Sequence, residues 1–173
     1  FCHFGVATAK MAVKDADIDI SREKSSRCGV CFGTTIGAEN DIYEHQHRRF
    51  LEFGPKAVGR YTAPEVTPHV ATGYICSELK ITGPNSTLSS GCSSGLDIVN
   101  WGYSMIRGGE VDMAVVGCAD SMIFPFAMST FCSLGILSKR NEEPEKASRP
   151  YDNDRDGLVA SEGGVSIVVE DLN

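Results

Sequence analysis

The sequence predicts an α/β fold, in which strands and helices alternate along one chain. Two short apolar runs flanked by glycine, residues 27–34 and 111–117, are typical of buried strands. Longer stretches with apolar residues at helical spacing lie between and around them. This alternation indicates helices layered on a sheet. With 173 residues, the chain is long enough for one domain with a substantial core.

The first half of the chain supplies three predicted helices and two strands. Residues 1–11 show helical spacing of apolar side chains but no capping residue before them. A charged, solvent-facing helix is predicted for residues 40–53. Pro64 opens another helix, which has one apolar stripe: Val66, Val70, Ala71, Tyr74, Ile75 and Leu79. After a turn at residues 83–85, residues 86–90 predict the second strand.

The second half continues the pattern with a helix and further extended segments. Residues 93–107 carry two apolar stripes, which predict a helix buried nearly all round. The strand at 111–117 follows, and a polar segment spans residues 138–156. Residues 158–170 close the chain as an extended or hairpin segment that ends in a strand.

Composition and charge exclude several classes of protein. A net charge of −7 with only 16 Lys and Arg argues against broad binding of nucleic acid. The longest nearly uncharged stretch, residues 113–137, contains Asp120 and is broken by glycines and Pro125, so no membrane span is expected. Seven irregularly spaced cysteines, an odd number, suit a reducing compartment, and no secretory signal opens the chain. We therefore expect a cytoplasmic protein.

Cys92 is the strongest candidate for a catalytic residue. It lies at a predicted strand-to-helix junction among small residues, which permit a sharp turn that projects one side chain into a pocket. The N-terminus of the following helix favours an anion and hence a thiolate. The backbone N–H of Cys92 is also a candidate oxyanion donor. The alternative is a buried, inert cysteine, which is a frequent fate of free cysteines.

Other candidate sites are weaker, and we expect no metal. Cys28 and Cys31 are three apart in a predicted strand, so their side chains point to opposite faces. His45 and His47 do not share a helix face, and His69 fits a packed histidine better than a catalytic base. Residues 152–157 resemble the start of a calcium loop, but the glutamate needed at loop position 12 is misplaced. A polar turn in which Arg149 and Arg155 brace the aspartates explains that segment better.

Four sequence motifs together resemble the β-ketoacyl synthases, the condensing enzymes of fatty-acid and polyketide synthesis. The motifs are R-C-G-V-C-F-G-T-T-I-G at 27–37, G-P-N-S-T-L-S-S-G-C-S-S-G-L-D at 83–97, G-C-A-D-S-M at 117–122 and L-S-K-R-N-E-E-P-E-K-A-S-R-P-Y-D-N-D-R-D-G at 137–157. Cys92 stands where this family keeps its nucleophile, and the resemblance covers nearly the whole chain.

The resemblance implies a fold and an activity. The fold is thiolase-like, with a mixed five-stranded sheet layered between helices, as the N-terminal half of an α-β-α-β-α sandwich. The activity is acyl transfer from an acyl carrier protein to Cys92, followed by decarboxylative Claisen condensation with malonyl-carrier protein. No cofactor is implied beyond the carrier's phosphopantetheine, and the complete protein is expected to be a homodimer. Ile36 and Phe131 are expected to line the acyl pocket.

The resemblance also implies that residues 1–173 form a partial domain, without the family's first strand and its C-terminal half. The two catalytic histidines belong to that half and match none of His3, His45, His47 or His69, so we expect the chain alone not to condense substrates. Gly91 replaces the family's usual alanine, which should loosen the turn. Ser161 and Val165 replace glycines and should disturb the closing hairpin. The alternatives are a thiolase-type acyltransferase and a non-catalytic subunit like the chain-length factors.

Overall fold

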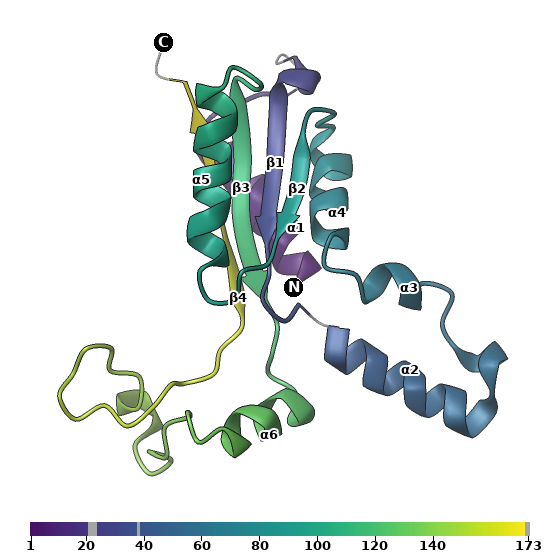
Figure 1. The fold of residues 1–173 in the computed structure, drawn as a ribbon, viewed down its shortest axis with the longest axis vertical. Helices are drawn as coiled ribbons and strands as arrows, with labels where there is room; N and C mark the ends of the chain where they lie inside the picture. The colour runs from purple at the N-terminus through teal and green to yellow at the C-terminus, as the bar shows by residue number, and fades with distance from the viewer. Residues whose placement is uncertain (21–23, 38, 172–173) are drawn as a thin grey trace. The chain divides into compact units, whose positions relative to one another are not determined.

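The computed structural model describes residues 1–20, 24–37 and 39–171 of the chain, and Figure 1 shows its elements. The helices are α1 (Cys2–Asp15), α2 (Glu39–Phe53), α3 (Thr62–Glu65), α4 (Val70–Leu79), α5 (Ser94–Arg107) and α6 (Pro125–Ser133). The strands are β1 (Cys28–Gly33), β2 (Asn85–Leu88), β3 (Met113–Asp120) and β4 (Gly163–Glu170). Strands and helices alternate, which confirms the predicted α/β class.

The strands form one mixed sheet in the order β2-β1-β3-β4. β1 pairs in parallel with β2 and with β3, whereas β4 runs antiparallel to β3. The sheet therefore has four strands among the described residues, and the expectation of five is wrong in number. The long stretch from 138 to 162, which is rich in charged residues, proline and glycine, contributes no strand to this sheet.

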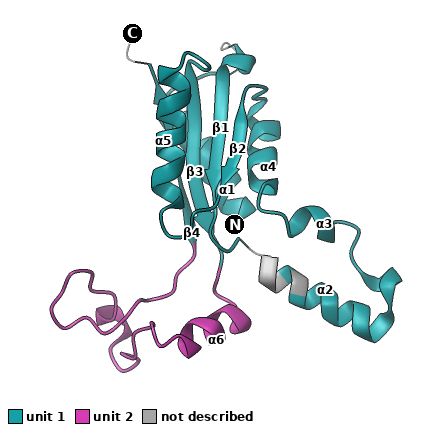
Figure 2. Ribbon diagram, viewed as in Figure 1, with its two compact units in different colours: residues 1–121, 163–173 teal, residues 122–162 magenta. Residues whose placement is uncertain are grey.

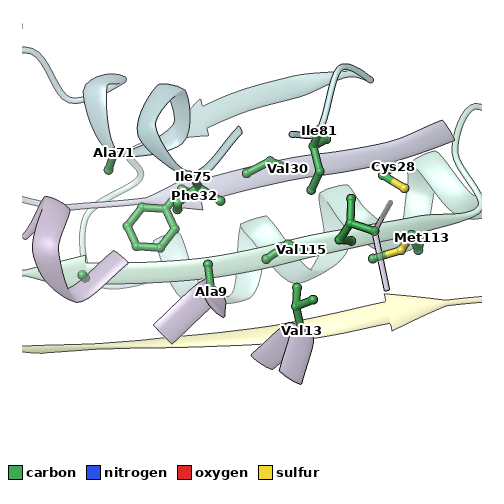
Figure 3. Close-up of a cluster of buried hydrophobic side chains, with 12 residues drawn as sticks. Ala9, Val13, Cys28, Val30, Phe32, Ala71, Ile75, Ile81, Met113 and Val115 are labelled. Atoms are coloured by element: carbon green, nitrogen blue, oxygen red, sulfur yellow. The ribbon is translucent and has the colours of Figure 1, made fainter. Parts of the chain in front are cut away.

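Helices cover both faces of the sheet. On one face, α1 and α4 pack on alternate residues of β1 and β3, and Figure 3 shows the resulting cluster around Phe32, Ile75 and Val115. On the other face, Ile98 of α5 packs against Cys31, Ala114 and Val116. The period of two in these strands explains why both faces are buried by apolar side chains.

Two helix predictions need correction. The helix expected to run from Pro64 to Leu79 is two helices, α3 and α4, separated by residues 66–69. Pro68 causes the break, because it has no N–H to donate and restricts the residue before it. Within α4, Ala71 and Ile75 are buried as predicted, but Tyr74 is exposed.

The helix predicted to be buried nearly all round is buried on one face only. Ser94, Ile98 and Gly102 of α5 are buried against the sheet. On the opposite face, Leu96 is 77% exposed and Tyr103 is 54% exposed. Apolar periodicity thus identified the helix correctly but overstated how much of it is covered in the described chain.

The chain divides into two compact units, which Figure 2 colours separately. The first contains the sheet and spans residues 1–121 and 163–173, and the second spans residues 122–162. In the second unit, Asp156 accepts hydrogen bonds from the Ser138 hydroxyl at 2.7 Å and the Lys139 N–H at 3.1 Å. Arg155 donates to the backbone carbonyl of Asp152 and so braces this turn as expected, whereas Arg149 donates to the backbone carbonyl of Lys146.

Among the described helices, none is both long enough and apolar enough to cross a membrane.

Candidate active site

Three parallel strands place their carboxyl ends at one edge of the sheet. β1 ends at Gly33, β2 ends at Leu88, and β3 ends at Asp120. We call this the carboxyl edge; it consists of Asp120 and the segments 34–37 and 89–93 that follow β1 and β2. Ligands of open α/β sheets bind outside the carboxyl ends of the strands. The candidate site therefore lies where the topology predicts one.

Cys92 lies in the turn between β2 and α5, and its side chain is exposed. Gly91, immediately before it, has a φ of +69°, which glycine adopts without strain. The Gly91 carbonyl accepts hydrogen bonds from the Ser94 N–H at 3.0 Å, the Ser94 hydroxyl at 2.7 Å and the Thr35 hydroxyl at 3.0 Å. These three bonds hold the turn through its main chain, and the expected loosening by Gly91 stays a prediction.

Asp120 organises the loop after β1. Its Oδ1 accepts hydrogen bonds from the N–H groups of Thr35, Ile36 and Gly37 at 3.0, 2.7 and 2.9 Å, and from the Thr34 hydroxyl at 2.9 Å. The Thr35 N–H also lies 3.0 Å from Oδ2. Hydrogen bonds to an ionised carboxylate are stronger than neutral ones. Asp120 is therefore the main anchor of residues 34–37.

The cysteines fall into three groups by accessibility, of which Cys2, Cys76 and Cys118 form the intermediate one. Cys92 and Cys132 are exposed, whereas Cys28 and Cys31 are buried. Burial raises the pKa of the Cys31 thiol to about 12. Burial, together with the nearby charge of Asp120, raises the pKa of the Cys118 thiol. A raised pKa lowers the thiolate fraction at neutral pH, so these two thiols are poorer nucleophiles than an ordinary cysteine.

The two predicted acyl-pocket residues belong to different units. Ile36 is half-buried and lines a cavity of about 40 Å³ together with Phe1, Gly37, Val66 and Ser89. This volume holds a few water molecules and not an acyl chain. Phe131 is half-buried on α6 in the second unit. Their role as a joint acyl pocket stays a prediction.

The weaker candidate residues lie on opposite faces of the sheet or at the surface. Cys28 packs on the α1 and α4 face and Cys31 on the α5 face, as expected for strand residues three apart. His3, His45, His47 and His69 are all exposed. No group of His, Cys, Asp and Glu that could hold a metal ion occurs within residues 1–20, 24–37 and 39–171.

Ser161 and Val165, which replace glycines of the resembling family, do not crowd the closing strand. Ser161 is exposed in the segment before β4. Val165 is 57% exposed and pairs with Cys118 of β3, so the antiparallel ladder accommodates its side chain. The ladder is regular at Val165, and the expected effect of Ser161, which lies outside the ladder, stays a prediction.

A family model decides what kind of protein carries this site. The model described as "Beta-ketoacyl synthase, N-terminal domain" matches residues 1–173. The chain belongs to the β-ketoacyl synthase family. Among named relatives of this synthase domain, 3-oxoacyl-[acyl-carrier-protein] synthase 2 of Vibrio cholerae is 33% identical over 99% of the chain. Polyketide beta-ketoacyl synthase 1 of Streptomyces halstedii is 38% identical over 96% of the chain.

Solved β-ketoacyl synthase structures confirm the thiolase-like fold. A chain in the complex of a type II polyketide acyl-carrier protein with its ketosynthase, bound to a hexaketide, matches 99% of the synthase domain with a TM-score of 0.90 and 26% identity. A β-ketoacyl synthase of Burkholderia phymatum matches 98% with a TM-score of 0.84 and 28% identity. The ishigamide ketosynthase/chain length factor also matches 98%, with a TM-score of 0.83.

The synthase domain spans only part of its relatives. It covers 41% of the length of the V. cholerae protein and 43% of the first structural neighbour's chain. Within the domain, sequence reasoning singled out Cys92 but gave Asp120 no role. The sequence signal that could have pointed to Asp120 is its place as the last residue of a largely buried strand, at the carboxyl edge.

Proposed function

We propose that this chain is the acyl-accepting part of a β-ketoacyl-[acyl-carrier-protein] synthase, with Cys92 as the nucleophile. The observation that carries the proposal is the exposed Cys92 thiol, which precedes the N-cap residue of α5 in a turn whose Gly91 carbonyl accepts three hydrogen bonds. A rigid, exposed cysteine at a helix N-terminus has the accessibility and the electrostatic setting that a nucleophile needs. Membership of the β-ketoacyl synthase family supports the same reaction class.

The first step is transfer of an acyl group to the enzyme. The Cys92 thiolate attacks the carbonyl carbon of an acyl thioester on the carrier's phosphopantetheine. The carbonyl oxygen gains negative charge, and we propose that the backbone N–H of Cys92 donates a hydrogen bond to it. When the intermediate collapses, the bond to the phosphopantetheine sulfur breaks, and that thiolate leaves and takes up a proton. The product is an acyl thioester on Cys92.

The second step extends the chain. Malonyl-carrier protein loses CO₂, and the resulting carbanion attacks the acyl carbonyl on Cys92. A carbon–carbon bond forms, the bond to the Cys92 sulfur breaks, and the thiol is restored by a proton. This step needs groups that stabilise the malonyl thioester oxygen. We assign that task to residues outside this chain, because its four histidines are exposed and match none of the family's catalytic positions.

The proposed partner is an acyl carrier protein, and the only prosthetic group is the phosphopantetheine that it carries. A structural neighbour with a TM-score of 0.90 comes from a complex of a ketosynthase with its carrier protein, which supports this choice. We further propose that the complete protein is a cytoplasmic homodimer and that Ile36 and Phe131 contact the acyl chain. The identity of that chain depends on those two positions.

One alternative is a non-catalytic subunit with the same fold. The structural match to a ketosynthase/chain length factor favours keeping this candidate. The Cys92 sulfur separates the two candidates, since a non-catalytic subunit needs no reactive thiol at this position. The exposed Cys92 favours the enzyme.

Acyl uptake distinguishes these candidates, and Cys132 supplies a matched control because its thiol is also exposed. The chain is incubated with an octanoyl thioester of N-acetylcysteamine, and intact mass is followed with time. We expect one octanoyl group on the wild type and on Cys132→Ala, and none on Cys92→Ala. Equal uptake by Cys92→Ala, or no uptake by the wild type, would overturn the proposed function.

A further inference from the structure

Asp120 connects two segments that meet at the carboxyl edge. Its Oδ1 collects four donors from the four consecutive residues 34–37. Those residues lie 83 to 86 positions earlier in the chain. A surface aspartate with only a local role would not draw so many main-chain donors to one atom. These hydrogen bonds indicate that the Asp120 carboxylate determines the conformation of residues 34–37.

The loop is curled around the carboxylate as it would be around a bound anion. The N–H groups of Thr35, Ile36 and Gly37 converge on Oδ1, and Gly37 has a φ of +65°. Successive N–H groups that converge in this way form an anion-binding concavity, often called a nest. Here the protein's own carboxylate fills the concavity. Without the negative charge, three aligned N–H dipoles would repel one another.

The same loop is hydrogen-bonded to the nucleophile's turn. Thr35 is held by Asp120 through its N–H and donates its hydroxyl proton to the Gly91 carbonyl at 3.0 Å. Gly91 is covalently joined to Cys92. The path from the Asp120 carboxylate to the turn therefore consists of two hydrogen bonds, joined through the single loop residue Thr35.

We propose that Asp120 is a positioning residue: by anchoring residues 34–37 it sets, through Thr35, the geometry of the Cys92 turn, and it also places the backbone of Ile36. The proposal rests on the proposed function, since the geometry matters for acyl transfer to Cys92. It deepens that function because one carboxylate would control both the nucleophile and a residue assigned to the acyl pocket.

A purely structural role makes a different prediction. If Asp120 only stabilises the sheet edge, replacing it lowers the free energy of unfolding, but the folded protein keeps its reactivity at Cys92. If Asp120 acts through Thr35, reactivity falls in folded protein, and the effects of the two residues are not independent. A double-mutant cycle separates these cases.

The cycle uses Asp120→Asn, Thr35→Val and the double variant in the 173-residue chain. The rate constant at Cys92 is measured twice, with iodoacetamide and with the octanoyl thioester, by mass spectrometry of the Cys92 peptide. We expect Asp120→Asn to slow both reactions about tenfold and Thr35→Val to slow them about fivefold. The double variant should be no slower than Asp120→Asn, because a displaced loop no longer uses the Thr35 hydroxyl.

Asp112→Asn is the matched control, since Asp112 immediately precedes β3 and pairs with Arg27. It should change the urea midpoint without changing either rate at Cys92. The proposal is overturned if the double variant slows the reactions by the product of the two single effects, about fiftyfold, or if Asp120→Asn reacts at the wild-type rate. Should Asp120→Asn not fold, an unchanged rate in folded Thr35→Val overturns it as well.

The two reagents keep the two claims separate. If the wild type accepts no octanoyl group at Cys92, the proposed function fails, while the iodoacetamide cycle still decides the role of Asp120. If the wild type is acylated but the cycle is multiplicative, the positioning role fails and the proposed function stands.

Discussion

The two ends of β3 each hold an aspartate, and they are used differently. Asp112, directly before the strand, pairs with the Arg27 guanidinium, which also donates to the carbonyls of Gly109 and Glu110 at 2.8 and 3.0 Å. Asp120, at the other end, receives main-chain N–H groups and the Thr34 hydroxyl. The pair of Arg27 with Asp112 links segments beside β1 and β3 whose backbone is already regular. The hydrogen bonds to Asp120 shape an irregular loop beside Cys92.

This difference teaches which interactions affect stability and which affect reactivity. An ion pair between side chains can be lost with little change in the backbone, because both groups then return to water. A carboxylate that orders consecutive N–H groups cannot be lost without moving the loop that they belong to. Changes at the carboxyl edge should therefore alter chemistry, and changes at the amino end should alter stability alone.

The largest expected effect is the loss of the nucleophile. Cys92→Ser should lower the rate of octanoyl transfer at least about a thousandfold, since a hydroxyl without a neighbouring base is a poor nucleophile. Cys92 is exposed, so the free energy of unfolding should change by less than about 0.5 kcal/mol. Single-turnover acylation and urea unfolding check the two parts. A large loss of stability in Cys92→Ser would show that Cys92 has a structural role, which contradicts its assignment as an exposed nucleophile.

A smaller effect should come from the residue before the nucleophile. Gly91→Ala puts a side chain on a residue with a φ of +69°, which costs about 1 kcal/mol. No described atom lies within 4 Å of the position of the new Cβ, so the cost is conformational and not steric. Transfer to Cys92 should slow about tenfold as the turn distorts. An unchanged rate would show that the three bonds to the Gly91 carbonyl hold the turn regardless of its backbone preference.

At the amino end of β3, replacing Arg27 should affect the stability of the protein only at acidic pH. The hydrogen bond from Arg27 lowers the pKa of Asp112 below its ordinary value of 3.8. The ionised Asp112 therefore stabilises the folded chain above pH 3.8, and this contribution is lost as the pH falls through the lower, folded-state pKa. In Arg27→Gln, the urea midpoint should depend less steeply on pH below about pH 4.

The same Arg27→Gln change should not alter the reactivity of Cys92. Acyl transfer to Cys92 by Arg27→Gln should equal that of the wild type at neutral pH. Asp156 is an internal reference for the acid titration. Its pKa is lowered by hydrogen bonds from the Ser138 hydroxyl and the Lys139 N–H, and we expect the Arg27→Gln change to leave these bonds in place. A reduced transfer rate in Arg27→Gln would mean that the two ends of β3 are coupled.

The smallest effect is expected on the outer face of α5. Leu96 is 77% exposed, so Leu96→Ala should change the free energy of unfolding of the described chain by less than about 0.5 kcal/mol. Ile98, which is 2% exposed, is the matched buried position, and Ile98→Ala should cost about 3 kcal/mol. Similar costs at both positions would indicate that a second surface covers α5.

The pair on α5 shows what a single sequence can and cannot predict. The short, glycine-flanked apolar run correctly identified β1, and helical spacing correctly identified α5, because both signals depend on neighbouring residues. Burial of the outer stripe of α5 depends on what packs there, which helical spacing does not encode. The break at Pro68 was a local signal that the longer apolar stripe outweighed.

The candidate site was predictable to the same extent. Cys92 was identified from the small residues around it and from the strand-to-helix junction, both of which are local. The bonds from Asp120 to Ile36 join residues 84 positions apart, and only the parallel pairing of β1 with β3 brings them together. The location of the site at the carboxyl edge could be predicted from the sequence, but the hydrogen bonds between its residues could not.

The central claim is that the carboxyl edge makes Cys92 the acyl acceptor among seven cysteines. The most direct test is peptide mapping of every cysteine after the wild-type chain reacts briefly with a limiting amount of octanoyl thioester. We predict that the octanoyl group is found on Cys92, while the exposed Cys132 and the buried Cys31 stay unmodified. A label on Cys132 equal to or greater than that on Cys92 would contradict the account, because exposure alone would then explain the reactivity.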